Sequence, residues 1–153
     1  MIEIHIPGRG LFRLEHAVFD VNGTLAVDGD LLPRVKELLE ELRQHVAVHM
    51  LTADTHGRQA TIDAVLGFPA ERIGTPEGKV AFVKTLGAAR VVAIGNGAND
   101  AGMLAKAALG IAVLGPEGTA VEALQAADVV VSNIQAAIEL LLYPQRLIAT
   151  LRK

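Results

Sequence analysis

The chain has 153 residues, of which 51% are hydrophobic, 20% charged and only 3% aromatic, a balance typical of one folded domain (residues 1–153) with a core of aliphatic side chains. The formal net charge of −3, the lack of a long basic run and the scarcity of aromatic rings argue against nucleic acid or an anionic membrane as a partner. Cysteine is absent, which excludes disulfides, thiolate catalysis and cysteine-based zinc sites, and fits a reducing cytoplasm.

The chain begins with two predicted strands. Ile2, Ile4 and Ile6 alternate with polar residues, which predicts a strand over residues 2–6. A Pro-Gly-Arg-Gly turn and a second strand over residues 11–14 complete a predicted N-terminal β-hairpin. No basic segment precedes an apolar stretch, and nowhere do about 18 apolar residues follow one another, so neither a signal peptide nor a membrane span is predicted.

From residue 17 onward, short apolar runs alternate with helical patterns. The predicted strands cover residues 17–19 (ending at Asp20), 46–51, 91–94, 111–114 and 129–131. The predicted helices cover residues 32–43, 58–66, 78–86, 100–108, 119–126 and 134–142, after which Pro144 interrupts the pattern before the tail. Strands that alternate with helices through short connections predict a three-layer, Rossmann-like α/β fold, in which helices cover both faces of a parallel sheet.

Polar residues follow three of these strands, where parallel sheets bind their ligands. The three segments are Asp20-Val21-Asn22-Gly23-Thr24, Thr52-Ala53-Asp54 and Gly95-Asn96-Gly97-Ala98-Asn99-Asp100, and Lys79 begins the helix before the third. A carboxylate can accept a phosphoryl group, hydroxyl and N–H groups can hold its oxygens, lysine supplies positive charge, and carboxylates suit Mg²⁺. The set therefore indicates magnesium-dependent phosphoryl transfer, in which positioning and charge neutralisation supply most of the catalysis.

These motifs, in this order, resemble those of the haloacid dehalogenase superfamily of phosphohydrolases, whose pattern is Asp-x-Asp-Gly-Thr, a Thr or Ser after a strand, a Lys and an acidic loop. Residues 76–113 look most like the phosphorylation domain of P-type ATPases, and the small proteins called soluble P-type ATPases resemble nearly the whole chain. The resemblance implies that Asp20 is the nucleophile. It implies catalytic positions at Asp20, Asn22, Thr52 and Lys79, phosphate binding by Asp20, Thr52, Ala53, Lys79 and Asn99, and Mg²⁺ binding by Asp20, Asn22, Asn96 and Asp100.

Two positions depart from the family pattern. Asn22 stands where the family has the Asp that protonates the leaving group and then activates water, and an amide does neither, although its backbone carbonyl can still bind Mg²⁺. General acid–base catalysis is worth about 10²–10⁴-fold, so we expect slow turnover of alkyl phosphates and less effect on good leaving groups. Asn96 stands where a magnesium-binding Asp is usual, which predicts a weaker metal site with Asp100 acting directly or through water.

Several residues have competing interpretations. Lys84 lies on the same predicted helix as Lys79, but Lys79 has the family spacing from the third segment. Asp54 is interpreted as a cap of the following helix. His56 lies shortly after Thr52 and is a further candidate for the site. The Gly95-Asn96-Gly97 run lacks the third glycine of a dinucleotide-binding loop, and Asp20-Val21-Asn22 is a poor match to a receiver domain.

The gaps between the motifs leave no room for a cap domain. Thr24 and Thr52 are 28 residues apart and Thr52 and Lys79 are 27 apart, and predicted core elements fill both intervals. An open site of this kind suits a large substrate or an oligomer, so a homodimer or homotetramer is a candidate. The hairpin and the apolar residues Leu140, Leu141, Leu142 and Leu147 are the candidate contact surfaces.

The sequence therefore predicts a magnesium-dependent phosphatase or ATPase-like hydrolase that acts through phospho-Asp20 on a small phosphorylated substrate or nucleotide. The two asparagines leave a second hypothesis open. It is a catalytically weakened module that binds phosphate esters and keeps the fold.

Overall fold

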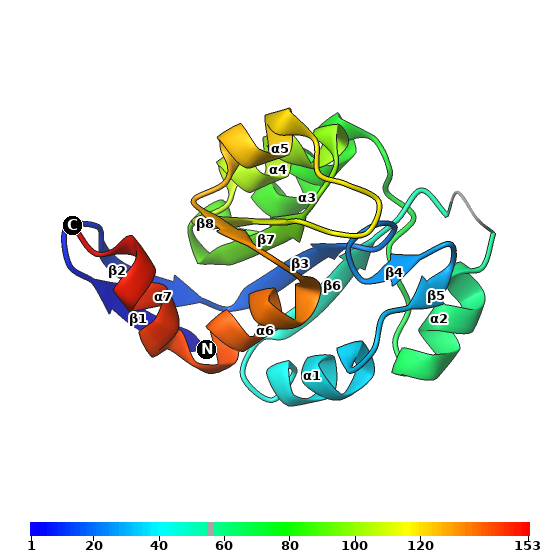
Figure 1. Cartoon of the computed structure of the whole chain (residues 1–153), viewed down its shortest axis with the longest axis horizontal. Helices are drawn as coiled ribbons and strands as arrows, with labels where there is room; N and C mark the ends of the chain where they lie inside the picture. Colours follow the sequence, from blue (N-terminus) through cyan, green and yellow to red (C-terminus); the bar gives the residue numbers. More distant parts are fainter. Residues whose placement is uncertain (55–56) are drawn as a thin grey trace.

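The computed structural model describes residues 1–54 and 57–153, whose centre is a five-stranded sheet (Figure 1). All neighbouring strands are parallel, as the alternation of strands and helices predicts. In order across the sheet, the strands are β6 (Ala47–Leu51), β3 (His16–Asp20), β7 (Val91–Gly95), β8 (Leu109–Val113) and β9 (Val129–Val131).

Side chains of the sheet alternate between two hydrophobic cores, one on each face. In β3, Ala17 and Phe19 join the larger core while Val18 joins the smaller one. In β7, Val92 and Ile94 alternate in the same way with Val91 and Ala93. Because successive strand residues point to opposite faces, an unbroken apolar strand is what a sheet covered on both sides requires.

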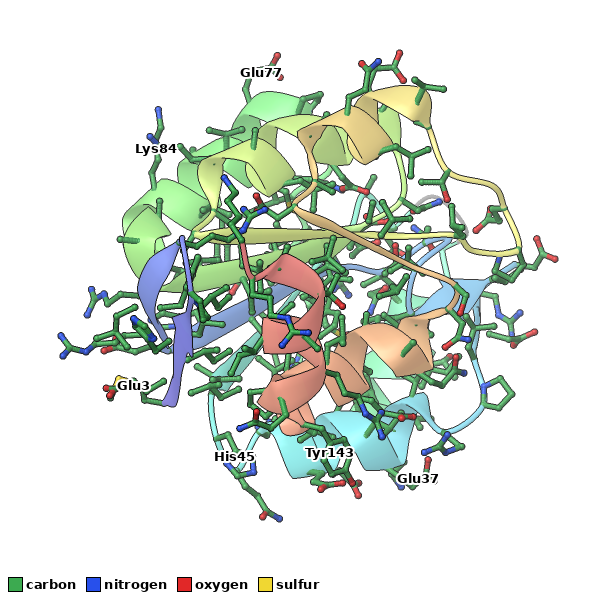
Figure 2. The ribbon with its side chains drawn as sticks, turned by 60° about the vertical axis from the view of Figure 1, so that its left-hand side comes forward. Glu3, Glu37, His45, Glu77, Lys84 and Tyr143 are labelled. Atoms are coloured by element: carbon green, nitrogen blue, oxygen red, sulfur yellow. The ribbon has the colours of Figure 1, made fainter. Side chains whose placement is uncertain are left out.

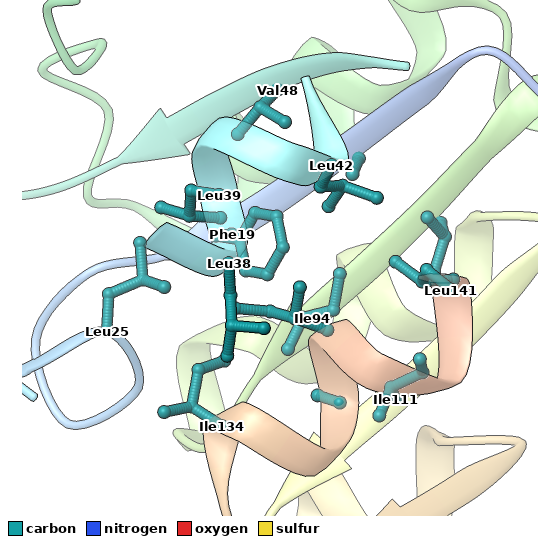
Figure 3. Packing of buried hydrophobic residues seen from close by; sticks show 14 of the residues in the cluster. Phe19, Leu25, Leu38, Leu39, Leu42, Val48, Ile94, Ile111, Ile134 and Leu141 are labelled. Carbon is teal, nitrogen blue, oxygen red and sulfur yellow. The ribbon is translucent and has the colours of Figure 1, made fainter. Parts of the chain in front are cut away.

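Helices cover both faces. The face of the larger core carries α1 (Val35–Leu42), α2 (Gln59–Leu66) and α6 (Ile134–Leu142). Figure 3 shows Phe19 and Ile94 packed among leucines of α1 and α6 and Ile134. The opposite face carries α3 (Pro76–Leu86), α4 (Ala101–Lys106) and α5 (Val121–Ala126), with short 3-10 turns at Ala88–Arg90 and Ala98–Asp100.

Some predicted boundaries are wrong. The helix predicted over 32–43 begins at Val35, after Pro33 and Arg34, which has a positive φ of 66°. The helix predicted over 100–108 is a 3-10 turn followed by α4, and it ends at Lys106 so that β8 begins already at Leu109. Hydrophobic periodicity shows which residues face the core. It does not show where a residue with a positive φ delays the start of a helix, or where a 3-10 turn replaces an α-helix.

A small subdomain forms next to the amino-terminal ends of the strands of the sheet. The predicted hairpin is present as β1 (Ile2–Ile6) and β2 (Gly10–Leu14), and the tail forms an unpredicted helix, α7 (Pro144–Leu151), that packs on β1. Leu147 is fully buried there, and Leu141 of α6 is buried in the larger core. The prediction that these two leucines offer a contact surface is therefore wrong, because they already pack inside the chain.

The described residues between the motifs form no cap domain. Residues 25–51 form a short flap of two strands, β4 (Ala26–Val27) and β5 (Asp30–Leu31), followed by α1 and β6. The described residues between β6 and α3 hold only α2 and its connections. None of the helices in the described ranges has the length and apolar character needed to cross a membrane.

Candidate active site

The carboxyl ends of β6, β3 and β7 bring the predicted site residues together. Because β3 lies between the other two strands, Asp20 at its end has Thr52 on one side and Asn96 on the other. The strand register aligns Asp20 with Leu51, the residue before Thr52. The sheet topology therefore converts three distant sequence segments into one cluster.

Lys79 enters this cluster from the first turn of α3. The helix begins cleanly, because the Thr75 hydroxyl accepts a hydrogen bond from the Gly78 N–H at 3.0 Å and Pro76 occupies the first helical position. The Lys79 side chain is only 1% exposed, and its Nζ donates to Asp20 Oδ1 at 2.8 Å and to Asp100 Oδ1 at 2.7 Å. One ammonium group thus bridges two carboxylates in a buried ion triad.

Asp100 holds the loop that follows β7. Its Oδ2 accepts hydrogen bonds from the backbone N–H groups of Asn96 at 3.0 Å and Gly97 at 2.9 Å, while Oδ1 faces Lys79. The side chain is completely buried. Asp100 therefore acts from beneath the site, as a link between the lysine and the loop.

The loop after β3 is joined to the loop after β7 through Thr24. The Thr24 hydroxyl lies 3.4 Å from Asp20 Oδ2 and 3.0 Å from Asn96 Oδ1. The Asn96 amide in turn donates to the Gly118 carbonyl at 3.0 Å. Gly23 has a φ of 82°, and a Cβ at this position would lie 2.7 Å from Asn96 Nδ2, so glycine is required by both backbone and space.

Asn22 and Thr52 meet beside Asp20. The Asn22 Nδ2 donates to Thr52 Oγ1 at 3.3 Å, and the same hydroxyl oxygen accepts the Asp54 N–H at 2.8 Å. Asp54 Oδ1 accepts the N–H of Gln59, the first residue of α2, at 3.1 Å, but the N-cap position itself is taken by Arg58, which makes no side-chain cap bond. The Thr52 hydroxyl keeps its own hydrogen to donate.

Burial changes the proton affinity of the triad. Burial, together with the negative charge of Asp100, raises the pKa of Asp20 to about 7, although Lys79 opposes this rise. Burial by itself lowers the pKa of Lys79, but Asp20 and Asp100 outweigh it and the pKa of Lys79 is raised. Lys79 is therefore charged at neutral pH, while Asp20 is poised to accept a proton unless another cation approaches.

Above the triad lies a polar pocket of about 260 Å³. Six of the predicted residues line it: Asp20, Asn22, Ala53, Lys79, Asn96 and Asn99. Thr52 and Asp100 are buried and do not line it, so they lie behind its wall. Gly97 and Glu117 complete the lining. Glu117 was missed by the sequence reasoning, although it too follows a strand, in the Gly115-Pro116-Glu117-Gly118 loop after β8.

The donor atoms of this pocket fit a hard divalent cation. Asp20 and Asn96 line the pocket with carboxylate and amide groups, Asn22 lines it too and its backbone carbonyl is the predicted ligand, and the triad of one ammonium and two carboxylates carries a net negative charge when Asp20 is ionised. No group of three His, Cys, Asp or Glu side chains arranged for a metal is found among the described residues. That is compatible with Mg²⁺, which keeps several waters and needs only one or two carboxylates.

One rival residue does not reach the site. Lys84, on the far part of α3, is exposed and points away from the sheet into solvent (Figure 2). The alternative that Lys84 is the phosphate-binding lysine is therefore wrong in this fold. His56 lies outside the described residues.

The chain is similar to several known proteins. An uncharacterised protein of Methanocaldococcus jannaschii is 46% identical over 63 residues, which make up 41% of this chain and 68% of that protein. The probable cation-transporting ATPase G of Mycobacterium tuberculosis is 40% identical over 110 residues, covering 70% of this chain but only 14% of the ATPase. The chain therefore matches only a small part of that transporter.

A solved structure shares the fold. The 3-deoxy-D-manno-octulosonate 8-phosphate phosphatase of Moraxella catarrhalis, solved with a magnesium ion, a phosphate ion and KDO, aligns with a TM-score of 0.70 and 19% identity over 90% of this chain and 92% of that chain. The family model of haloacid dehalogenase-like hydrolases matches residues 10–108, a range that contains Asp20, Lys79 and Asp100. The chain belongs to the haloacid dehalogenase-like hydrolases.

Proposed function

We propose that the protein is a Mg²⁺-dependent phosphohydrolase that forms a phospho-Asp20 intermediate on a small phosphorylated substrate. The observation that carries this proposal is the buried Lys79 bridge between Asp20 and Asp100, with Asp20 and Lys79 both open to the polar pocket. A phosphoryl group placed there meets a carboxylate nucleophile and a fixed ammonium at once.

The first step is attack by an Asp20 carboxylate oxygen on the phosphorus atom. The new O–P bond forms as the bond to the leaving group breaks, and the leaving oxygen takes the electron pair. Lys79, the Asn99 amide and the Ala53 backbone N–H, all from pocket-lining residues, are the donors that hold the phosphoryl oxygens, and the buried Thr52 hydroxyl supports the site through its hydrogen bonds with Asn22 and Asp54. Bound Mg²⁺ would be held by Asp20, the Asn22 carbonyl, Asn96 and, indirectly, Asp100, and would neutralise phosphate charge.

The second step, hydrolysis of the acyl phosphate, lacks an obvious general base. At position 22 the side chain is an amide whose NH₂ donates to Thr52, so it cannot take a proton from water. We propose that Asp20 accepts phosphate faster than water removes it, and that substrates with good leaving groups are favoured.

The decisive test is phosphate release from p-nitrophenyl phosphate, acetyl phosphate and ATP with and without Mg²⁺, run with wild type and Asp20→Asn. We expect release that needs Mg²⁺ and disappears in the variant, and a covalent phosphate that hydroxylamine removes. Equal release by both proteins would show that Asp20 is not the nucleophile.

A matched control is Asp28→Asn. Asp28 is an exposed flap aspartate with a positive φ of 53°, a conformation that Asn tolerates well. It removes one carboxylate without touching the pocket, so its phosphate release should equal that of wild type.

The Asn22 amide also supports a second candidate, a module that binds phosphate esters without turning them over. Its signature is calorimetric binding of phosphate esters in the presence of Mg²⁺ with no phosphate released. Detection of the hydroxylamine-sensitive intermediate would exclude it.

A further inference from the structure

Glu117 is a pocket residue that the proposed reaction leaves without a role. It lies in the loop after β8 and lines the same pocket as Asp20, Asn22 and Asn96. Its side chain is exposed, and within residues 1–54 and 57–153 it makes no hydrogen bond or ion pair. An unpaired carboxylate at the mouth of an anion-binding pocket opposes phosphate binding unless a cation lies between them.

The lack of a side chain at Gly23 leaves room for Glu117 over the pocket. Glu117 Oε2 lies 3.0 Å, and Asn96 Oδ1 3.1 Å, from the point that a Cβ on Gly23 would occupy. The two side chains therefore converge over the backbone of the residue after Asn22. Glu117 is placed where it faces the same small volume as the predicted magnesium ligands.

The loop that carries Glu117 is tied to Asn96 next to it. The Asn96 side chain donates to the Gly118 carbonyl at 3.0 Å, and the Asn96 carbonyl accepts the Ala120 N–H at 2.9 Å. The Gly118 N–H closes the turn on the Gly115 carbonyl at 3.0 Å. These bonds hold the loop against the pocket, so the Glu117 carboxylate lies close to the pocket.

Glu117 is distinguished from the other carboxylates around the pocket by the lack of a neutralising cation in the described part of the chain. Among the residues that the structure describes, two carboxylates line the pocket, Asp20 and Glu117, because Asp100 is buried beneath it and engaged by Lys79 and two backbone N–H groups. Lys79 already pairs with Asp20. Glu117 is thus the pocket carboxylate that no described cation neutralises.

We propose that Glu117 supplies the second anionic group of the divalent-cation site, by accepting hydrogen bonds from water molecules of the hydrated Mg²⁺. Contact through water fits an ion that sheds its waters reluctantly, and it fits the lack of a direct three-carboxylate cluster among the described residues. In this assignment the negative charge missing from the Asn96 amide is provided by the adjacent loop. The inference rests on the magnesium site of the proposed function.

The test is calorimetric titration of the whole chain with MgCl₂ alone, at fixed ionic strength. Outer-shell partners of metals are typically worth about 10- to 100-fold in affinity, and we expect Glu117→Gln to weaken Mg²⁺ binding by at least about 10-fold. The matched control is Glu122→Gln, an exposed glutamate in the first turn of α5 that does not line the pocket. Its affinity should stay within about twofold of wild type, since an exposed charge beyond the site is screened by salt.

A double-mutant cycle tests the pairing with Asn96. Asn96→Asp restores a carboxylate beside Glu117 and gives up the amide bond to the Gly118 carbonyl, while the Ala120 N–H bond to the Asn96 carbonyl still ties the loop. We therefore expect tighter Mg²⁺ binding and a smaller loss when Glu117→Gln is added to it. A Glu117→Gln affinity equal to that of wild type or of the Glu122 control would overturn the inference, as would a failure of wild type to bind Mg²⁺.

Metal binding and turnover separate this inference from the proposed function. Mg²⁺ binding that depends on Glu117, with no phosphate released from any substrate, would uphold the inference and sink the hydrolase assignment. If phosphate is released through Asp20 but the Mg²⁺ affinity is the same in wild type and Glu117→Gln, the hydrolase assignment stands and the inference about Glu117 is wrong.

Discussion

At the scale of single residues, Asn22 determines whether the site has an acid–base group beside the nucleophile. Asn22 donates its amide hydrogen to Thr52, so the position beside the nucleophile is a hydrogen-bond donor. A carboxylate there would have to accept a hydrogen bond instead. The Thr52 hydroxyl can supply it, because that oxygen already accepts the Asp54 N–H and its own hydrogen is free to turn.

Asn22→Asp should therefore fit without strain and should accelerate the turnover of alkyl phosphates. A group able to protonate the leaving oxygen is worth about 10²–10⁴-fold, whereas aryl or acyl phosphates, which leave unaided, should gain much less. Steady-state rates for a glycerol phosphate and p-nitrophenyl phosphate give the comparison. An equal gain on both substrates, or no gain on either, would show that leaving-group protonation does not limit the enzyme.

The raised pKa of Asp20 has a consequence for stability. In the metal-free protein the folded state retains the proton up to about pH 7, against 3.8 for the ordinary group, so between these values the folded state binds more protons than the unfolded state. The stabilisation is present below pH 3.8 and is lost as the pH rises through 7. Lys79 remains charged throughout this range because its pKa is raised.

Asp20→Asn removes this titration. We expect its free energy of unfolding, relative to wild type, to be higher at pH 8 than at pH 5 by at least about 1 kcal/mol, since one pKa unit corresponds to about 1.4 kcal/mol. Urea unfolding in EDTA at the two pH values measures it, and titrations common to both proteins cancel. A difference that does not change with pH would contradict the shift.

At the scale of elements, the start of α3 sets the position of Lys79. The Thr75 cap and Pro76 fix where the first turn begins, and Lys79 lies in that turn. Asn133 caps α6 in a similar way, with Oδ1 accepting the Ala136 N–H at 2.8 Å, but α6 carries none of the predicted site residues. The two caps form a natural pair for comparison.

Thr75→Ala and Asn133→Ala should each destabilise the protein by about 1 kcal/mol, the usual value of an N-cap side chain. Thr75→Ala should in addition weaken Mg²⁺-dependent phosphate binding several-fold, because Lys79 loses its fixed starting point. Urea unfolding and calorimetric phosphate titration provide the two measurements. If both variants weaken phosphate binding equally, the cap of α3 has no special link to the site.

The elements also show what the sequence could and could not predict. Strands such as β3 and β7 were predictable because their unbroken apolar runs serve two cores, and the rule that ligands bind at carboxyl strand ends located Asp20, Thr52 and Asn96. The helix α7 was missed because Pro144 reads as a break, whereas here it occupies the first position of a new helix. Glu117 was missed because it lies four residues beyond the end of β8, in a loop that matches none of the four motifs.

At the scale of the whole molecule, the pocket and the small subdomain of β1, β2 and α7 lie at opposite ends of the strands of the sheet. The pocket lies at the carboxyl ends of the strands, whereas β1, β2 and α7 join the amino-terminal edge, next to the start of β3 (Figure 1). Two backbone-directed bonds fasten this subdomain, from Arg9 Nε to the Leu151 carbonyl at 2.9 Å and from the Lys153 N–H to the Pro7 carbonyl at 2.9 Å. Stability and activity should therefore respond separately to changes there.

Leu147 and Leu11 test this separation with the same chemical change. Leu147 on α7 is fully buried, and Leu11 on β2 is 49% exposed. Leu147→Ala should lower the free energy of unfolding by about 2–5 kcal/mol, through lost burial and the cavity left behind, while Leu11→Ala should change it by about 0.5 kcal/mol or less. Both variants should keep the wild-type Mg²⁺ affinity under conditions where they are folded, since neither residue touches the pocket. A Leu147→Ala protein that is folded by circular dichroism yet binds Mg²⁺ poorly would mean that the two edges of the sheet are coupled.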